Sequence, residues 1–173
     1  FPPHGNEQTC QMYVAQQLRE LDIQPDVYDI DSVPELATHP QFWPGRSYRD
    51  RPNVNGRVSG SGGRSLILSG HIDTVPADTP IAWRHDPHGG EQVDGRIYGR
   101  GAWDMKAGVA INLTVLKAVR RLNATLGGDL IFEAVVDEEF GGANGTLAGR
   151  LRGYNADAAV VTESTSLRIC PAQ

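Results

Sequence analysis

Three short apolar runs in this chain of 173 residues each end in acidic or histidine residues. The runs are residues 66–68, 130–136 and 158–161, and the polar residues after them are His71 and Asp73, then Glu138 and Glu139, then Glu163. Short continuous apolar runs are typical of strands buried on both faces of a parallel sheet. In open α/β sheets, ligands collect beyond the carboxyl ends of the strands. The pattern therefore predicts an α/β fold with polar side chains gathered at one edge.

Helical periodicity fills the spaces between these strands. Apolar residues recur at three- and four-residue steps in residues 7–21 and again in residues 105–122, where the stripe runs from Val109 to Leu122. We expect further elements as follows: strands at 25–30 and 53–59, a short helix at 146–151, an irregular segment at 33–52 and a long loop at 74–101. Strands alternating with helices predict a three-layer sandwich with a mostly parallel mixed sheet, covered by helices on both faces.

The charge balance narrows the function classes. Acids outnumber bases by 21 to 16, whereas a nucleic-acid-binding surface would need a basic face, so we expect no nucleic-acid partner. The chain has no apolar run of about 18 residues, so we expect no membrane span. Two cysteines, Cys10 and Cys170, do not make a disulfide framework, which favours a cytoplasmic location.

His71 and Asp73 are the first candidates for chemistry. At strand spacing, residues i and i+2 point to the same side. A metal-bound histidine commonly donates its second ring N–H to a carboxylate, so this pair suits a metal site. The alternative is a satisfied polar pair at a strand end.

Three further carboxylates extend the candidate site. Asp104 stands before the long helix, where its alternative role is an N-cap, but Gly99 and Gly101 indicate an unusual backbone path. Glu138 and Glu139 are adjacent, so one of them can bind a metal while the other moves protons. The alternative for this pair is a solvated turn.

Together, one histidine and several carboxylates fit a site for Zn²⁺ or a similar divalent ion held by nitrogen and oxygen ligands. Two cysteines are too few for a thiolate zinc site. The sequence contains no Gly-x-Ser-x-Gly nucleophile motif and no phosphate-binding Gly-x-x-x-x-Gly-Lys motif. We therefore predict a metal-dependent enzyme. A non-catalytic binding module is the alternative from another class.

Three segments, residues 69–76, 99–108 and 137–142, closely resemble the co-catalytic zinc hydrolases in their order and spacing. That family includes acetylornithine deacetylase, succinyl-diaminopimelate desuccinylase, aminoacylase and the glutamate carboxypeptidases. The resemblance implies part of a zinc-peptidase-like catalytic domain with two Zn²⁺ ions, for which Co²⁺ or Mn²⁺ can substitute.

The resemblance also implies a role for each site residue. His71, Asp104, Glu139 and Glu163 would bind metal, with Asp104 bridging both ions. Asp73 would orient His71, and Glu138 would act as general base and acid. A cis peptide bond is expected between Asp104 and Met105.

Residues 1–173 would correspond to the N-terminal portion of the catalytic domain, without the lid and dimerisation domain or the C-terminal return that carries a further histidine. The implied reaction is hydrolysis of the amide bond of an N-acyl amino acid by a water held between the zinc ions, in a protein that is a homodimer at full length. One alternative is an exopeptidase, a carboxypeptidase or dipeptidase acting on short peptides. Another is an inactive fragment with an incomplete metal site.

Overall fold

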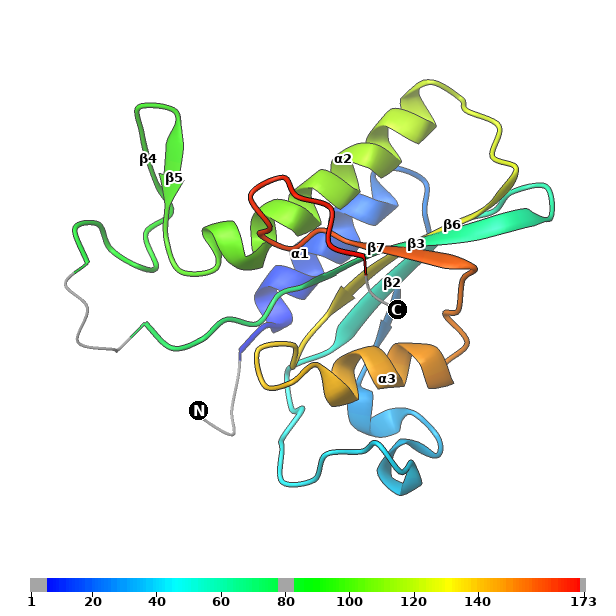
Figure 1. Cartoon of the computed structure of the whole chain (residues 1–173), viewed down its shortest axis with the longest axis horizontal. Helices are drawn as coiled ribbons and strands as arrows, with labels where there is room; N and C mark the ends of the chain where they lie inside the picture. The colour runs from blue at the N-terminus through cyan, green and yellow to red at the C-terminus, as the bar shows by residue number, and fades with distance from the viewer. Residues whose placement is uncertain (1–5, 78–82, 172–173) are drawn as a thin grey trace.

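A five-stranded sheet forms the centre of the computed structural model, which describes residues 6–77 and 83–171 (Figure 1). In spatial order its strands are β1 (Asp26–Tyr28), β2 (Asn53–Val58), β6 (Gly128–Val135), β3 (Gly63–His71) and β7 (Ala158–Val161). β3 is parallel to both β6 and β7, whereas β2 is antiparallel to β1 and β6. The predicted α/β fold with a mixed sheet is confirmed, and its parallel part is the β6–β3–β7 side.

Helices cover both faces of this sheet. α1 (Gln8–Arg19) and α2 (Ala107–Arg121) lie on one face, and α3 (Ala143–Leu151) lies on the other (Figure 1). Side chains of β6 contact the helices on both faces, because successive residues of a strand point to opposite sides. Phe132 is buried in one cluster with Leu18 of α1 and Leu116 of α2. Glu133 pairs with Arg150 of α3. The sandwich therefore has three layers.

The segment at 33–52 is irregular, as predicted, apart from the short 3-10 turn Leu36–Thr38; a second such turn, Ile30–Ser32, precedes it. It packs beside α3, where Val33, Leu36 and Tyr48 form a second buried cluster with Ala148. The cluster includes Val136, the residue directly after β6, so the irregular segment reaches the same edge of the sheet as the polar strand ends.

The loop prediction for residues 74–101 is wrong in part. β4 (Glu91–Val93) and β5 (Arg96–Tyr98) form an antiparallel hairpin that projects away from the main sheet (Figure 1). Asp94 and Gly95 join them with φ values of 50° and 74°. An Asp-Gly pair between short strands is a strong hairpin signal, because both residues tolerate positive φ. Residues 78–82 of the predicted loop lie outside the described residues.

Close packing brings the start of α2 against the parallel strands. A Cβ at Gly70 of β3 would lie 2.9 Å from Val109 Cγ2, and a Cβ at Gly108 would lie 2.2 Å from the carbonyl oxygen of Thr162. Real Cβ atoms essentially never lie within 3.0 Å of a neighbour, so a side chain at Gly108 would displace the backbone after β7, and one at Gly70 would displace Val109. The contacts hold the segment that carries Asp104 beside the ends of β3 and β7.

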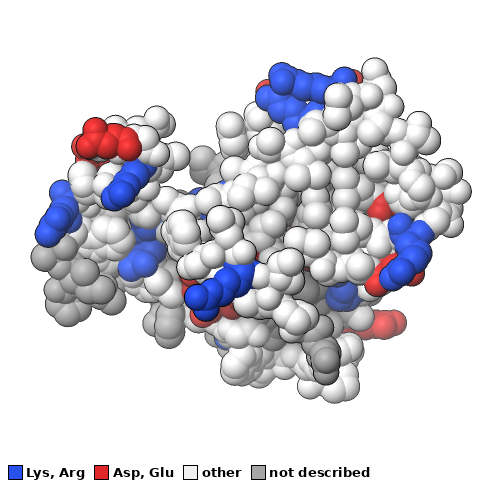
Figure 2. All heavy atoms as spheres, turned by 45° about the horizontal axis from the view of Figure 1, so that its top comes forward, with Lys and Arg blue, Asp and Glu red and all other residues white. Residues whose placement is uncertain are grey.

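No helix within residues 6–77 and 83–171 has the length and apolar character needed to cross a bilayer. On the face shown in Figure 2, Lys and Arg side chains form separate groups between large uncharged areas. The edge strand β7 is exposed along its whole length.

The apolar stripe of α2 yields a matched test. Leu116 is 1% exposed in the core, whereas Leu122, which the periodicity placed in the same stripe, is 78% exposed just beyond the helix. We expect Leu116→Ala to lower the free energy of unfolding by about 2–5 kcal/mol because it leaves a cavity. Leu122→Ala should change it by no more than about 0.5 kcal/mol. Urea denaturation of both variants measures the difference, and equal losses would contradict the packing.

Candidate metal centre

Four segments deliver the candidate ligands to one edge of the sheet. His71 is the last residue of β3, Glu138 and Glu139 follow β6, and Glu163 follows β7. Since these three strands are parallel, their carboxyl ends lie side by side. Asp104 comes from the turn Ala102–Lys106, which α2 holds against β3 and β7.

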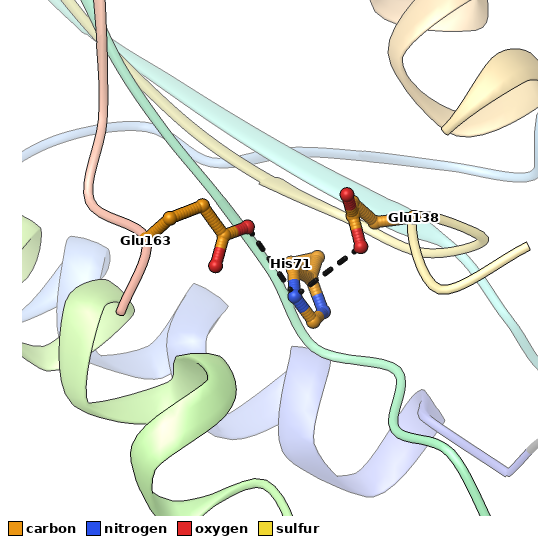
Figure 3. Close-up of side chains that lie close together, drawn as sticks. All are labelled: His71, Glu138 and Glu163. Carbon is orange, nitrogen blue, oxygen red and sulfur yellow. Dashed lines mark ion pairs between the residues drawn. The ribbon is translucent and has the colours of Figure 1, made fainter. Parts of the chain in front are cut away.

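The imidazole of His71 is the centre of the cluster. Its Nε2 lies 3.1 Å from Asp104 Oδ1, 3.5 Å from Glu138 Oε2 and 3.5 Å from Glu163 Oε1. Figure 3 shows Glu138 and Glu163 approaching the same ring nitrogen from two sides.

Two overlapping groups have ligand atoms within 4.8 Å of one another: His71 with Glu138 and Glu163, and His71 with Asp104 and Glu139. All four predicted metal ligands and the predicted base therefore lie together.

Asp73 lies on the other side of the imidazole and reaches further than predicted. His71 Nδ1 is 3.0 Å from the carbonyl oxygen of Asp73 and 3.5 Å from its Oδ1. The two carboxylate oxygens of Asp73 also accept the backbone N–H groups of Glu138 and Glu139, at 3.2 and 3.1 Å. Asp73 thus links the end of β3 to the turn after β6.

The capping alternative for Asp104 is not realised. Among the described residues, no side-chain hydrogen bond caps the turn Ala102–Lys106 or α2. The chain enters this turn through Gly101 at φ 75° and contains the expected cis peptide bond between Asp104 and Met105. The carboxylate of Asp104 lies 3.1 Å from His71 Nε2 and does not close the helix.

Crowded carboxylates shift the proton equilibria of the cluster. Burial lowers the pKa of His71, but its hydrogen bond to Asp73 and the neighbouring negative charges outweigh burial and raise the pKa to about 9. Burial raises the pKa of Glu138, Glu139 and Glu163, nearby carboxylates raise it further, and the imidazole opposes them. Such a site favours additional positive charge.

The donor atoms fit a divalent cation. Glu163 Oε1 is buried and has no hydrogen-bond partner within the described part of the chain, although His71 Nε2 lies 3.5 Å away. Buried polar atoms normally have a partner, so an orphaned carboxylate oxygen facing an imidazole is a suitable ligand position. Imidazole nitrogen and carboxylate oxygen are donors for Zn²⁺ and for Mn²⁺ or Co²⁺.

Two residues near the site received no role in the sequence analysis. Lys106 donates from Nζ to the carbonyl oxygen of Ile72, at 2.7 Å, and so ties the start of α2 to the backbone between His71 and Asp73. Asp137 is buried beside the glutamates and is held by Arg46. The sequence did offer a signal for both residues, because Lys106 lies in the segment 99–108 and Asp137 in the segment 137–142, which both contain residues that already had roles.

The hydrogen bond from His71 to Asp73 and the negative charge of Asp73 predict a raised pKa of His71 that can be measured. In the metal-free chain, NMR titration should place the pKa of His71 near 9, and Asp73→Asn should lower it towards the ordinary value of 6.5. The pKa falls because the carboxylate that this substitution removes stabilises the protonated imidazole. His71→Asn identifies the signal, and a wild-type pKa at the ordinary value would contradict the geometry.

Comparison with solved structures supports the same fold. An M20 family metallo-carboxypeptidase from Sulfolobus solfataricus superposes with a TM-score of 0.68 at 20% sequence identity, covering 92% of this chain and 32% of that chain.

Sequence comparison gives curated relatives. N-formyl-4-amino-5-aminomethyl-2-methylpyrimidine deformylase from Bacillus subtilis is 36% identical over 97% of this chain and 36% of its own length. Succinyl-diaminopimelate desuccinylase from Methylobacterium radiotolerans is 43% identical over 69% of this chain and 31% of its own length. The chain thus spans about a third of the length of these relatives. Residues 67–171 match the model of peptidase family M20/M25/M40. The chain belongs to this family, as the resemblance of its three motifs predicted.

Proposed function

We propose that the protein containing this chain hydrolyses the amide bond of an N-acylated amino acid or similar small amine at a two-zinc centre. In this proposal His71, Asp104, Glu139 and Glu163 bind the metals, and Glu138 is the general base. One observation carries it: His71 Nε2 lies within 3.5 Å of carboxylates from three segments that follow or flank parallel strands.

The names of the relatives support an acyl-removing reaction. One is a deformylase and the other a desuccinylase, so each name describes removal of an acyl group. The deformylase alignment covers 97% of this chain and so includes the segments that carry the cluster, but the chain spans only about a third of either protein. The acyl group and the amine are therefore left to a substrate panel.

Zinc ions bound at this cluster would supply Lewis acidity, which lowers the pKa of water and polarises a carbonyl group. The chain's own residues would do the rest. Asp73 holds the ring of His71 by Nδ1 and leaves Nε2 facing the carboxylates. Glu138, which is partly exposed, takes the proton of the attacking water and returns it to the departing amine.

A substrate panel separates the proposed deacylase from the alternative, an exopeptidase. An exopeptidase of the same family would cleave dipeptides in preference to acyl-amino acids, so both classes belong in the panel. Homodimerisation of the longer polypeptide and a cytoplasmic location stay predictions.

Substitution of the proposed base tests the mechanism. In the full-length polypeptide, Glu138→Gln should lower kcat by about 10²–10⁴-fold, because the amide cannot accept the proton of water. Metal content, measured by atomic emission, should stay near the wild-type value. Glu20→Gln, on the exposed end of α1, is the control. Near-normal turnover of Glu138→Gln would show that another group is the base.

Zinc titration of this chain tests the ligand assignment. By the family resemblance, His71, Asp104 and Glu163 would offer three ligands to one ion, whereas Asp104 and Glu139 would offer two carboxylates to the other. We therefore expect calorimetry to show one site filling well before the second. Glu163→Gln should weaken the first binding event and Glu139→Gln the second. Two equally tight sites in the unmodified chain would contradict this order.

A further inference from the structure

The irregular segment before β2 contacts the turn that carries Glu138 and Glu139, on the side away from Asp73. Arg46 donates from Nη1 to Asp137 Oδ1 at 2.9 Å and from Nη2 to the carbonyl oxygen of Phe140 at 2.8 Å. Its guanidinium carbon lies 5.1 Å from the ring centroid of Trp43 and 5.0 Å from that of Phe140. One arginine therefore contacts both ends of the turn 137–140.

Tyr48 adds a second contact from the same segment. Its hydroxyl donates to Asp137 Oδ2 at 2.6 Å, and it accepts a hydrogen bond from Asn144 Nδ2 at 2.7 Å. Tyr48 is 2% exposed and Asp137 is 1% exposed, so these contacts are shielded from water. Charge-assisted hydrogen bonds in such surroundings are stronger than those at the surface.

The backbone at Asp137 needs this support. Asp137 has φ 73°, in the left-handed region that non-glycine residues rarely adopt. This conformation turns the chain sharply after β6, so that Asp137 points towards Arg46 while Glu138 points towards His71. Gly141 follows at φ 98°, where a Cβ would lie 2.4 Å from Trp43 Cζ3. The turn and the segment 43–48 are thus fitted closely together.

On its inner side the same turn is held by Asp73, whose carboxylate accepts the N–H groups of Glu138 and Glu139. We propose that Arg46 and Tyr48 are positioning residues, which clamp the turn against Asp73 so that the two glutamates face His71. The inference rests on the proposed function, because it assigns the clamp to a cation-binding and proton-transferring pair.

A substrate-binding role for Arg46 fits the contacts less well. Both terminal nitrogens of its guanidinium are engaged by the turn, and aromatic rings lie beside it. Tyr48 is too deeply buried to touch a ligand directly. Both side chains therefore act through the turn.

Hydrogen exchange of the metal-free chain tests the clamp directly. In Arg46→Gln, the amides of residues 138–142 should exchange at least about tenfold faster than in the wild type, while the central strands keep their protection. Arg152→Gln is the matched control: Arg152 makes two hydrogen bonds to Asp26 and lies 4.6 Å from the ring centroid of Tyr28, beyond the end of α3. It should leave exchange at 138–142 unchanged. Equal exchange in the two variants overturns the inference.

Cobalt binding, followed by its visible absorption, provides a second readout. Arg46→Gln should weaken Co²⁺ binding by about 10–100-fold, as for other residues that orient metal ligands, whereas Arg152→Gln should stay within about twofold. Arg46→Lys should recover part of the loss, because lysine keeps the charge but not the forked geometry. Wild-type affinity in Arg46→Gln would count against the clamp.

The two proposals fail in different ways. If the wild-type chain binds no Co²⁺ and no Zn²⁺, the metal centre fails, and hydrogen exchange still decides whether Arg46 holds the turn. If Arg46→Gln does not fold, Tyr48→Phe carries the test, because it removes only the hydroxyl that donates to Asp137. Unchanged exchange at 138–142 in Tyr48→Phe would then overturn the inference.

Discussion

His71 is almost fully buried, yet its Nε2 has carboxylate oxygens of Asp104, Glu138 and Glu163 within 3.5 Å. Negative charges this close repel one another, so the arrangement depends on positive charge at its centre. In the free chain a proton on the imidazole supplies that charge: Asp73 first, and then Glu138 and Glu163, outweigh burial and raise the pKa of His71 to about 9. A divalent cation supplies more charge but requires the neutral imidazole as ligand. Cation affinity should therefore rise with pH until the imidazole proton is lost.

Backbone geometry makes this concentration of charge unavoidable. In the parallel registers His71 is level with Val135, and Ser69 is level with Val161. Each of the three strands therefore releases its next residues at a similar height, and their acids meet. Asp104 joins them only because α2 packs closely on β3 and β7, which depends on Gly70 and Gly108. The same contacts that build the core thus assemble the cluster.

Local signals in the sequence predicted much of this fold. Apolar runs and helical periodicity located the main strands and helices, because burial of one face imposes a short repeat on the chain. The hairpin around Asp94 and Gly95 was missed although its turn signal was present. Leu122 was assigned to the buried stripe because periodicity does not show where a helix leaves the core.

The sequence allowed the ligand residues of the site to be predicted, but not the residues that hold those ligands in place. Motif resemblance indicated His71 and the acids, whereas spacing alone left Asp104 open as a helix cap. The clamp lies beyond local reasoning, since Arg46 and Asp137 are 91 positions apart. No short-range pattern links them. Only the packing of the irregular segment beside α3 brings them together.

Support for the ligands differs from one side of the cluster to the other. Glu138 and Glu139 follow β6, which has a neighbour on each side, and their turn is held by Asp73 and Arg46. Glu163 follows β7, which pairs only with β3 among the described strands and is exposed along its length. Its buried Oε1 has no hydrogen-bond partner within the described residues. A cation bound to Glu163 and His71 would therefore also fasten the edge strand to the centre of the sheet, coupling metal binding to the order of β7.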